Sequence, residues 1–377
     1  MTAFLDLGAA IDDDFAMPQQ PLELTAFLRA MPKVEIHCHL LGTVRHATFV
    51  ELATRNRAPL DRTEIDGFYT RGEKPVGVLR VLRALDAHLI ARPDDLYRIA
   101  REYLEDAFTH GIRYSEFFWN PTGTVRQSRI PYGAAQAALV GAIRDAESDL
   151  GIVARLIPSI DREADSAAAV EMVEWVAAER LPEVIGIGID YREPEHPPEL
   201  FWKAYRAAHR AGLKTTAHAG EFGMPWTNVE TALDLLEVDR IDHGYTVLDN
   251  PDLTRRCAER GIVFTVVPTN SHYLRTLPPE RWAAEHPIRH MPRHGLRIHP
   301  NTDDPTLHKV TPTQCWHMMI EHFGCGLDDL RAFMLNGLDG AWLPDETRRQ
   351  WRQAWATEFD TLRERLVGAP AGVAAGP

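Results

Sequence analysis

The feature that most constrains the fold of this 377-residue chain is a repeated alternation of short apolar or β-branched runs with longer amphipathic stretches. Runs of this length suit buried parallel strands, and the stretches between them show the spacing of helices. A repeated strand–helix unit predicts an α/β fold, here a (β/α)8 TIM barrel. The eight expected strands are residues 34–39, 112–119, 152–158, 184–190, 213–218, 240–243, 262–267 and 296–301.

The helices of this repeat carry the expected signals at their ends. Four glycines, Gly111, Gly151, Gly212 and Gly261, each stand directly between an amphipathic stretch and a strand. A helix commonly ends in a left-handed residue, for which glycine is preferred, so these positions predict helix ends. The clearest expected helices are residues 94–110, 132–150, 167–180, 199–211 and 251–260.

Extra helices are expected in two places. The first crossover is long and contains helical stretches near 46–55 and 76–89, and Phe68 and Tyr69 within it are candidates for a lid over the barrel mouth. Further helices follow the last strand and end with 344–366. We therefore expect one domain over residues 1–366 and a disordered tail, rich in Ala, Gly and Pro, over 367–377.

Composition narrows the classes of partner. No apolar stretch approaches the roughly 20 residues that span a bilayer, so no membrane contact is expected. The formal charge of −13 disfavours nucleic acid, because binding to phosphates depends on Lys and Arg. The N-terminal segment lacks the basic region of a secretory signal, and the four cysteines form no CxxC pair, which predicts a cytoplasmic location. A small-molecule substrate is expected, and the oligomeric state stays open.

Motifs that can carry chemistry follow four of the expected strands. The carboxyl ends of parallel barrel strands meet at one mouth, so side chains at these ends converge. Imidazole and carboxylate groups in such a cluster are typical of a hydrolytic zinc centre with acid/base groups beside it. The motifs are His37-Cys38-His39, His218-Ala219-Gly220-Glu221, His243-Gly244 and Asp303-Asp304-Pro305.

Each motif has a purely structural alternative when it is taken alone. Strand alternation turns His37 and His39 into the barrel and Cys38 towards the helices, where Cys38 is a core thiol. His218 alone would more often be a hydrogen-bonded core residue, and His243 could be the partner of a loop. Glu221 could be an acid at a helix N-terminus, and Asp303-Asp304 could cap a helix. The structural alternatives weaken when all these residues occur together at strand ends.

The sequence from Met31 to Leu338 resembles the adenosine deaminase family of the amidohydrolase superfamily. The resemblance rests on Met-Pro-Lys-Val-Glu-Ile-His-Cys-His-Leu, Ala-His-Ala-Gly-Glu, Arg-Ile-Asp-His-Gly and Asn-Thr-Asp-Asp-Pro. It implies one Zn2+ per chain and hydrolytic deamination of a 6-aminopurine. The implied ligands are His37, His39, His218 and Asp303; Glu221 would face purine N1, His243 would assist the metal-bound water, and Asp304 would meet N7.

The residue types fit this chemistry independently of the resemblance. Zinc with an open coordination position lowers the pKa of bound water to about 7, so hydroxide is available near neutral pH. Attack at C6 of an aminopurine breaks ring aromaticity, and N1 must gain a proton from an acid such as Glu221. His243 and Asp304 could hold the attacking water and the purine.

Two departures from the family pattern concern the substrate. Members of the family usually carry an acid just before the glycine that follows the first motif. In this chain the glycine is Gly42 and the residue before it is Leu41, which cannot accept a hydrogen bond from a sugar or a purine N–H. After the fourth strand, Asp190 and Glu193 precede His-Pro-Pro, which is similar to the adenine deaminase branch. We expect Leu41, Asp190, Glu193 and Asp304 near the substrate. Adenosine, adenine and N6- or 5′-modified aminopurines all stay open.

Two other functions remain as alternatives. One is a different amidohydrolase that opens a cyclic amide at a two-metal centre, although the fourth strand offers Asp190 and no bridging Lys. The other is a non-catalytic barrel that binds a purine. A cytidine-type zinc deaminase is disfavoured because the chain lacks the His-x-Glu and Pro-Cys-x-x-Cys signature.

Overall fold

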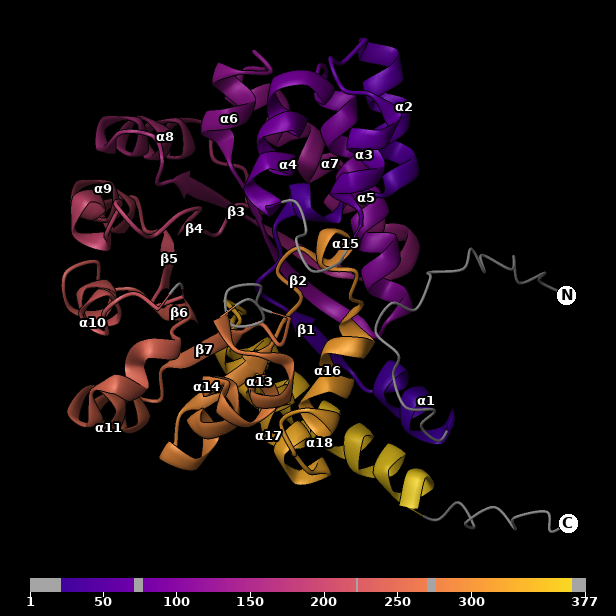
Figure 1. Ribbon diagram of the computed structural model, residues 1–377, viewed down its shortest axis with the longest axis vertical. Coiled ribbons are helices and arrows are strands. Elements are labelled where there is room, and N and C mark those ends of the chain that lie inside the picture. Colours follow the sequence, from indigo (N-terminus) through magenta and orange to yellow (C-terminus); the bar gives the residue numbers. More distant parts are fainter. Residues whose placement is uncertain (1–21, 71–76, 222, 270–275, 368–377) are drawn as a thin grey trace, which may run out of the picture.

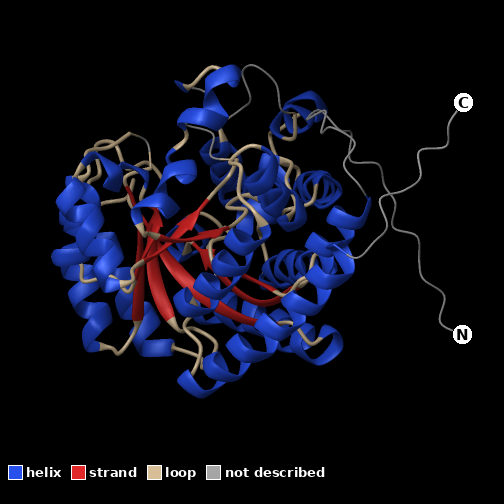
Figure 2. Cartoon of the chain, turned by 90° about the horizontal axis from the view of Figure 1, so that it is seen from below, coloured by secondary structure: helices blue, strands red, loops and turns tan. Residues whose placement is uncertain are grey.

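A computed structural model describes residues 22–70, 77–221, 223–269 and 276–367. Its sheet contains eight parallel strands, each paired with its neighbour in sequence. The strands occupy the interior and helices surround them (Figures 1 and 2). The strands are β1 (Lys33–Glu35), β2 (Ile112–Trp119), β3 (Val153–Asp161), β4 (Gly186–Asp190), β5 (Lys214–Ala219), β6 (Arg240–His243), β7 (Val263–Val266) and β8 (Arg297–Pro300).

Hydrogen bonds just beyond the last strand join it to the first. The amide of His39 donates to the carbonyl of Asp303 at 2.8 Å, and the amide of Asp303 donates to the carbonyl of His37 at 3.1 Å. These bonds continue the parallel pairing from β8 back to β1, so the sheet curls into the expected (β/α)8 barrel. They also hold the histidine motif of the first strand against the aspartate motif of the last.

Helices of the repeat cover the outside of the barrel (Figure 2). The α-helices are α1 (Leu22–Ala30), α2 (His46–Asn56), α3 (Arg62–Phe68), α4 (Val78–Ala84), α5 (Pro93–Thr109), α6 (Pro121–Arg126), α7 (Tyr132–Leu150), α8 (Ser166–Glu179), α9 (Trp202–Arg210), α10 (Thr227–Asp234), α11 (Pro251–Arg260), α13 (Pro279–Glu285), α14 (Pro287–His290), α15 (Pro305–His308), α16 (Pro312–Glu321), α17 (Leu327–Gly340) and α18 (Asp345–Val367). Short helical turns are η1 (Leu40–Thr43), η2 (Leu85–Leu89), η3 (Pro198–Phe201), η4 (Tyr245–Asp249) and η5 (Met291–His294).

The expected helix ends are confirmed. Gly111, Gly151, Gly212 and Gly261 all have positive φ angles, between 66° and 77°. None of the described helices combines the length and the apolar character that a bilayer crossing requires. The last helix extends to Val367, one residue into the expected tail, and the rest of that tail lies outside the described residues.

The first crossover differs from the expectation for a lid. Phe68 and Tyr69 are buried against Phe49, and the Tyr69 hydroxyl donates to the carbonyl of Val44 at 2.8 Å. Their large apolar rings pack into the core of the excursion, whereas α4, the next helix, reaches the barrel mouth. The lid assignment of these two residues is therefore wrong.

The opposite end of the barrel is closed by buried ionic groups. Arg240 forms an ion pair with Glu116, and its guanidinium also donates to the carbonyls of Ile36 and Gly340 at 3.0 and 3.1 Å. Lys33 donates to the carbonyls of Leu28 in α1 and Met31 just after it, at 2.6 and 2.7 Å. Burying these groups is tolerated because most of their N–H groups have acceptors, and the remaining Arg240 Nε atom lies 4.0 Å from the Asp242 carboxylate.

Candidate active site

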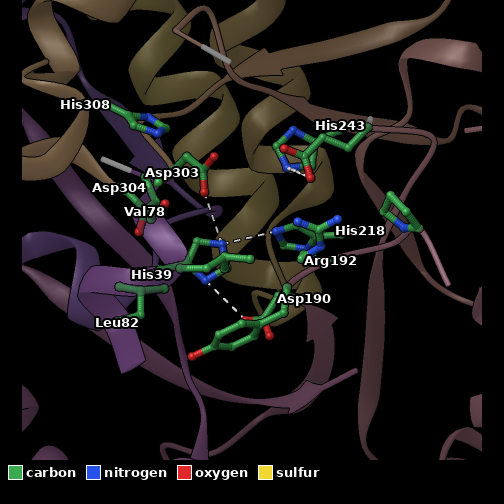
Figure 3. A pocket seen from close by; sticks show the side chains of 15 residues that line it. His39, Val78, Leu82, Asp190, Arg192, His218, His243, Asp303, Asp304 and His308 are labelled. Atoms are coloured by element: carbon green, nitrogen blue, oxygen red, sulfur yellow. Dashed lines mark hydrogen bonds and ion pairs between the residues drawn. The ribbon is translucent and has the colours of Figure 1, made fainter. Parts of the chain in front are cut away.

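A cavity of 470 Å³ lies at the carboxyl ends of the strands. Its wall includes side chains that follow β1, β4, β5, β6 and β8, together with Val78 and Leu82 of α4 (Figure 3). In a TIM barrel this end is where active sites are built. Seven of the residues predicted from the sequence line it: His39, Asp190, His218, Glu221, His243, Asp303 and Asp304.

Four of the predicted metal ligands come together at the floor of this cavity. The Nε2 atom of His39 lies 3.1 Å from His218 Nε2 and 3.1 Å from Asp303 Oδ1 (Figure 3). His37 is fully buried below them, with its Nε2 atom 3.6 Å from the same Asp303 oxygen. Ligand atoms of His37, His218, His243 and Asp303 lie within 4.8 Å of one another, and His39 contacts two members of this cluster, His218 and Asp303.

The spacing of these four atoms fits a tetrahedral metal ion. Ligand atoms about 2.0–2.1 Å from a tetrahedral Zn2+ are about 3.3 Å from one another. The distances from His39 to His218 and from Asp303 to His39 and His37, which are 3.1, 3.1 and 3.6 Å, are close to this value. The buried Nε2 atom of His37 has no hydrogen-bond partner within the described part of the chain. An imidazole nitrogen left in this state and aimed at a carboxylate is explained by a cation between them. The donors, imidazole nitrogens and a carboxylate oxygen, are of the types that Zn2+ binds.

Buried acceptors on the far sides orient the three imidazoles. The Nδ1 atom of His37 lies 3.2 Å from the Thr265 carbonyl, and Nδ1 of His218 lies 3.3 Å from Asp242 Oδ2. Such partners fix the tautomer that leaves Nε2 free to bind a metal.

His39 is oriented in the same way by Asp190. Its Nδ1 atom lies 3.2 Å from Asp190 Oδ2, and the other oxygen of Asp190 accepts a hydrogen bond from Asn120 at 2.7 Å. Asp190 was expected near the substrate, and it does reach the cavity wall, but both of its oxygens have protein partners. The geometry assigns it first to His39.

Asp242 and Thr265 were not predicted from the sequence. Strand alternation would turn Asp242 and His243 to opposite faces, but His243 has a φ angle of 64°, which breaks the alternation, and both side chains contact the central histidines. Two further residues at strand ends, Tyr191 and Asp303, have φ angles of 68° and 65°. Left-handed backbone at such side chains is strained and is typical of functional sites.

The electrostatics around His218 agree with metal binding. Burial alone would raise the pKa of Asp242, but its close contact with His218 and the nearby His37 hold that pKa well below the usual range. Burial lowers the pKa of His218 to about 4, and the neighbouring His37 adds to this effect. Asp242 is thus an anion and His218 a neutral imidazole at neutral pH, which is the state that ligates a metal.

Glu221 and His243 face each other on one side of this centre. A Glu221 carboxylate oxygen lies 3.7 Å from His243 Nε2, and both residues line the cavity. Burial, with a smaller contribution from His37, lowers the pKa of His243 well below its usual value, so the ring is neutral at pH 7. An acid and a neutral base therefore stand beside the candidate metal position.

Asp304 does not have the structural role of a helix cap. It precedes α15, but its side chain makes no capping hydrogen bond and lines the cavity instead. Space for it depends on Gly42, where an added Cβ would lie 1.9 Å from the Asp304 carboxylate. Gly42 of the first motif thus allows Asp304 of the last motif to face the centre.

Two predicted substrate residues do not reach the wall of the cavity. Leu41 is buried in the core, with only 3% of its surface exposed. Glu193 is 1% exposed, and its carboxylate accepts hydrogen bonds from the protein backbone. The structure therefore does not support direct contact of either residue with a substrate in this cavity.

Comparison with known proteins agrees with the geometry. The family model described as adenosine deaminase matches residues 32–357. This chain belongs to the adenosine deaminase family. It is 66% identical to an amidohydrolase from Burkholderia ambifaria whose crystal structure has bound Zn, with a TM-score of 0.92 and coverage of 94% of this chain and 98% of that one.

Two adenine deaminases are more distant relatives. The enzyme from Arthrobacter aurescens is 25% identical, with a TM-score of 0.80 over 88% of this chain and 100% of its own. A protein named adenine deaminase from Chlorobium luteolum is 34% identical over 286 residues, which cover 74% of this chain and 80% of the relative. The family and the barrel predicted from the sequence are both confirmed.

Proposed function

We propose that this protein is a zinc-dependent aminopurine deaminase, and that its substrate is adenine. The reaction replaces the 6-amino group of the purine by oxygen from water and releases ammonia. The observation that carries this function is the convergence of three histidine nitrogens and Asp303 beside an acid, Glu221, and a neutral His243. Hydrolytic deamination requires a metal, a proton donor and a proton acceptor in this arrangement.

His37, His39, His218 and Asp303 would hold the zinc ion, whose chemistry is to make water acidic enough to act as a nucleophile near neutral pH. Glu221 gives a proton to purine N1, so that C6 can accept the nucleophile without a full negative charge on the ring. Neutral His243 accepts a hydrogen bond from the attacking water and orients it. Asp304 accepts a hydrogen bond from N7–H and orients the purine ring.

Adenine is supported by the relatives and by the cavity. The curated relatives that we compared are named adenine deaminase, and so is the Arthrobacter aurescens structure. The wall opposite His243 is aliphatic, with Val78 and Leu82 from α4 (Figure 3). An aliphatic wall offers no acceptor for sugar hydroxyls, and this favours a free base over a nucleoside.

The same aliphatic wall favours a second candidate, an adenine with a small alkyl group on N6. Leu79 adds to the apolar surface that Val78 and Leu82 present to the cavity. An alkyl group placed against these side chains would gain binding energy by leaving water. The product would then be an alkylamine instead of ammonia.

The test is turnover by purified zinc-loaded protein of adenine, adenosine, 5′-methylthioadenosine and N6-methyladenine. We expect the highest kcat/KM for adenine, measured by the ultraviolet change and by ammonia release. Preference for adenosine would refute the free-base assignment, and preference for N6-methyladenine would favour the second candidate. Absence of turnover across the panel would refute deamination. A cytoplasmic location stays a prediction.

A further inference from the structure

Glu193 is a buried carboxylate whose partners belong to the segment that carries Glu221. It is 1% exposed, and within the described chain it forms no ion pair with a cationic side chain. One of its oxygens accepts the Gly220 amide at 2.8 Å and the Asn228 side-chain amide at 2.7 Å. The other accepts the Glu221 amide at 3.1 Å. Three donors therefore compensate one buried negative charge.

The two backbone donors have a specific place in the chain. They are the amides of Glu221 itself and of the residue before it, so they determine the direction in which Glu221 leaves the end of β5. Gly220 has a φ angle of 73°, and a Cβ there would lie 2.5 Å from Thr246 Oγ1 and 2.8 Å from Val229 Cγ2. Only glycine fits this conformation, and glycine leaves the backbone flexible. Hydrogen bonds from neighbouring groups are therefore needed to hold this turn in one conformation.

Asn228 holds the Glu193 carboxylate from the other side. It belongs to α10, is 7% exposed, and contacts the same oxygen that accepts the Gly220 amide. Glu193 follows β4 whereas Glu221 follows β5, so the carboxylate joins two neighbouring loops of the barrel mouth and the first turn of α10.

We propose that Glu193 is a positioning residue for the catalytic acid: its carboxylate clamps the backbone of Gly220 and Glu221 so that the Glu221 side chain faces the substrate and His243. This inference rests on the proposed function, because it takes Glu221 to be the acid. The proposal also gives a role to Glu193, a buried acid that lies beside the site but does not reach the cavity wall. A displacement of about 1 Å in an acid is enough to lower the rate of proton transfer substantially.

The test substitutes Glu193→Gln, which removes the charge and turns an N–H group towards one of the backbone donors. We expect kcat to fall about 100-fold, as for a misplaced catalytic group, while KM changes little. Zinc content should stay close to that of the wild type, and the melting temperature should fall by only a few degrees, because one buried donor loses its acceptor. Amide hydrogen exchange at Gly220 and Glu221 should become faster. Glu195→Gln, an exposed acid in the same loop, is the matched control and should match the wild type in all these properties.

A double variant separates positioning from general structural support. In a Glu221→Gln background, Glu193→Gln should cost little further rate, because the side chain on which it acts is already inactive. A further loss of the same size as in the wild type would overturn the proposal, and so would an unchanged kcat in the single variant. Equal loss of zinc and activity would also overturn it.

A milder substitution keeps the test informative if Glu193→Gln does not fold. Asn228→Ala removes one of the three donors and leaves both backbone bonds, so kcat should fall by about 3- to 10-fold. An unchanged kcat in this variant would count against the clamp. The wild type is measured first: lack of turnover there refutes the proposed function, whereas the hydrogen-exchange result still decides whether Glu193 holds the Gly220–Glu221 backbone.

Discussion

The two ends of the barrel contain buried charged groups that behave in opposite ways. At the end where the strands begin, Arg240 and Glu116 pair with each other, and Glu116 also accepts hydrogen bonds from Tyr114 and the Trp342 amide. At the carboxyl end, polar atoms such as His37 Nε2 point towards a common position without a hydrogen-bond partner among the described residues.

The difference teaches how one scaffold separates stability from chemistry. Most of the hydrogen-bond capacity of the groups at the closed end is used within the protein, so removing one partner of the ion pair would leave a buried charge and destabilise the fold. Groups at the mouth keep capacity for a metal and a substrate, at a cost in stability that the surrounding core offsets. Substitutions at the mouth should therefore alter metal binding and turnover, and substitutions at the closed end should alter the free energy of unfolding. The predictions below test this separation in order of decreasing effect on turnover.

Loss of a metal ligand should have the largest effect. His218→Ala removes one of the four proposed ligands, so we expect zinc content to fall far below one ion per chain and turnover to be lost, as metal analysis and ammonia release would measure. The control is His294→Ala, at an exposed histidine, which should retain the zinc content and the turnover of the wild type. Full zinc content in His218→Ala would contradict ligation.

Glu221→Gln should have the second-largest effect on turnover. The substitution retains size and polarity but removes the acidic proton, so kcat should fall by about 10²- to 10⁴-fold. Zinc content should stay at one ion per chain, because Glu221 is not among the ligands. The exposed Glu259→Gln is the control. A kcat near that of the wild type would remove Glu221 from the mechanism and, with it, the role proposed for Glu193.

Asp242→Asn tests the orientation of the ligands. The variant loses the anion beside His218 Nδ1, so zinc affinity should fall by about 10- to 100-fold, as a chelator competition would measure. Excess zinc should restore most of the turnover, because the ligands themselves remain. Asp252→Asn, at an exposed position, should leave affinity unchanged. Unchanged affinity in Asp242→Asn would show that His218 is oriented by packing alone.

Glu116→Gln should affect turnover least. It removes the nearest anion of the buried Arg240 guanidinium and leaves only Asp242, at 4.0 Å, so the free energy of unfolding should fall by about 3–5 kcal/mol. Urea unfolding would measure this loss, with the exposed Glu346→Gln as reference. The folded variant should keep its zinc and its kcat. A large fall in kcat without a loss of stability would show that the two ends are coupled.

Much of the fold could be predicted from local patterns. β2, β6, α7 and α11 have the bounds expected from the sequence, because strand and helix periodicity are visible in short windows. The first crossover was harder. From the sequence, Phe68 and Tyr69 could either cover the barrel mouth or be buried in the core of the first crossover. Their contacts with Phe49 in the structure place them in the core.

The cluster of candidate metal ligands was also predictable, since strand ends in a barrel converge whatever lies between them. The residues that contact the substrate were harder to predict from the sequence. Leu41 and Glu193 were expected near the substrate from their place in the sequence, yet both turn into the protein. A residue one or two positions from a strand end can face either way, because loop conformation determines its direction.

The sequence by itself determined the repeated strand–helix pattern, the helix ends at glycines and the set of histidines and acids at strand ends, because these depend on local periodicity and residue chemistry. Only the tertiary structure decided which acid serves which group: Asp242 beside His218, Asp190 beside His39, and Glu193 beneath the Glu221 backbone. These pairings depend on barrel closure and on left-handed backbone at strand ends, and both arise from contacts between residues far apart in the chain.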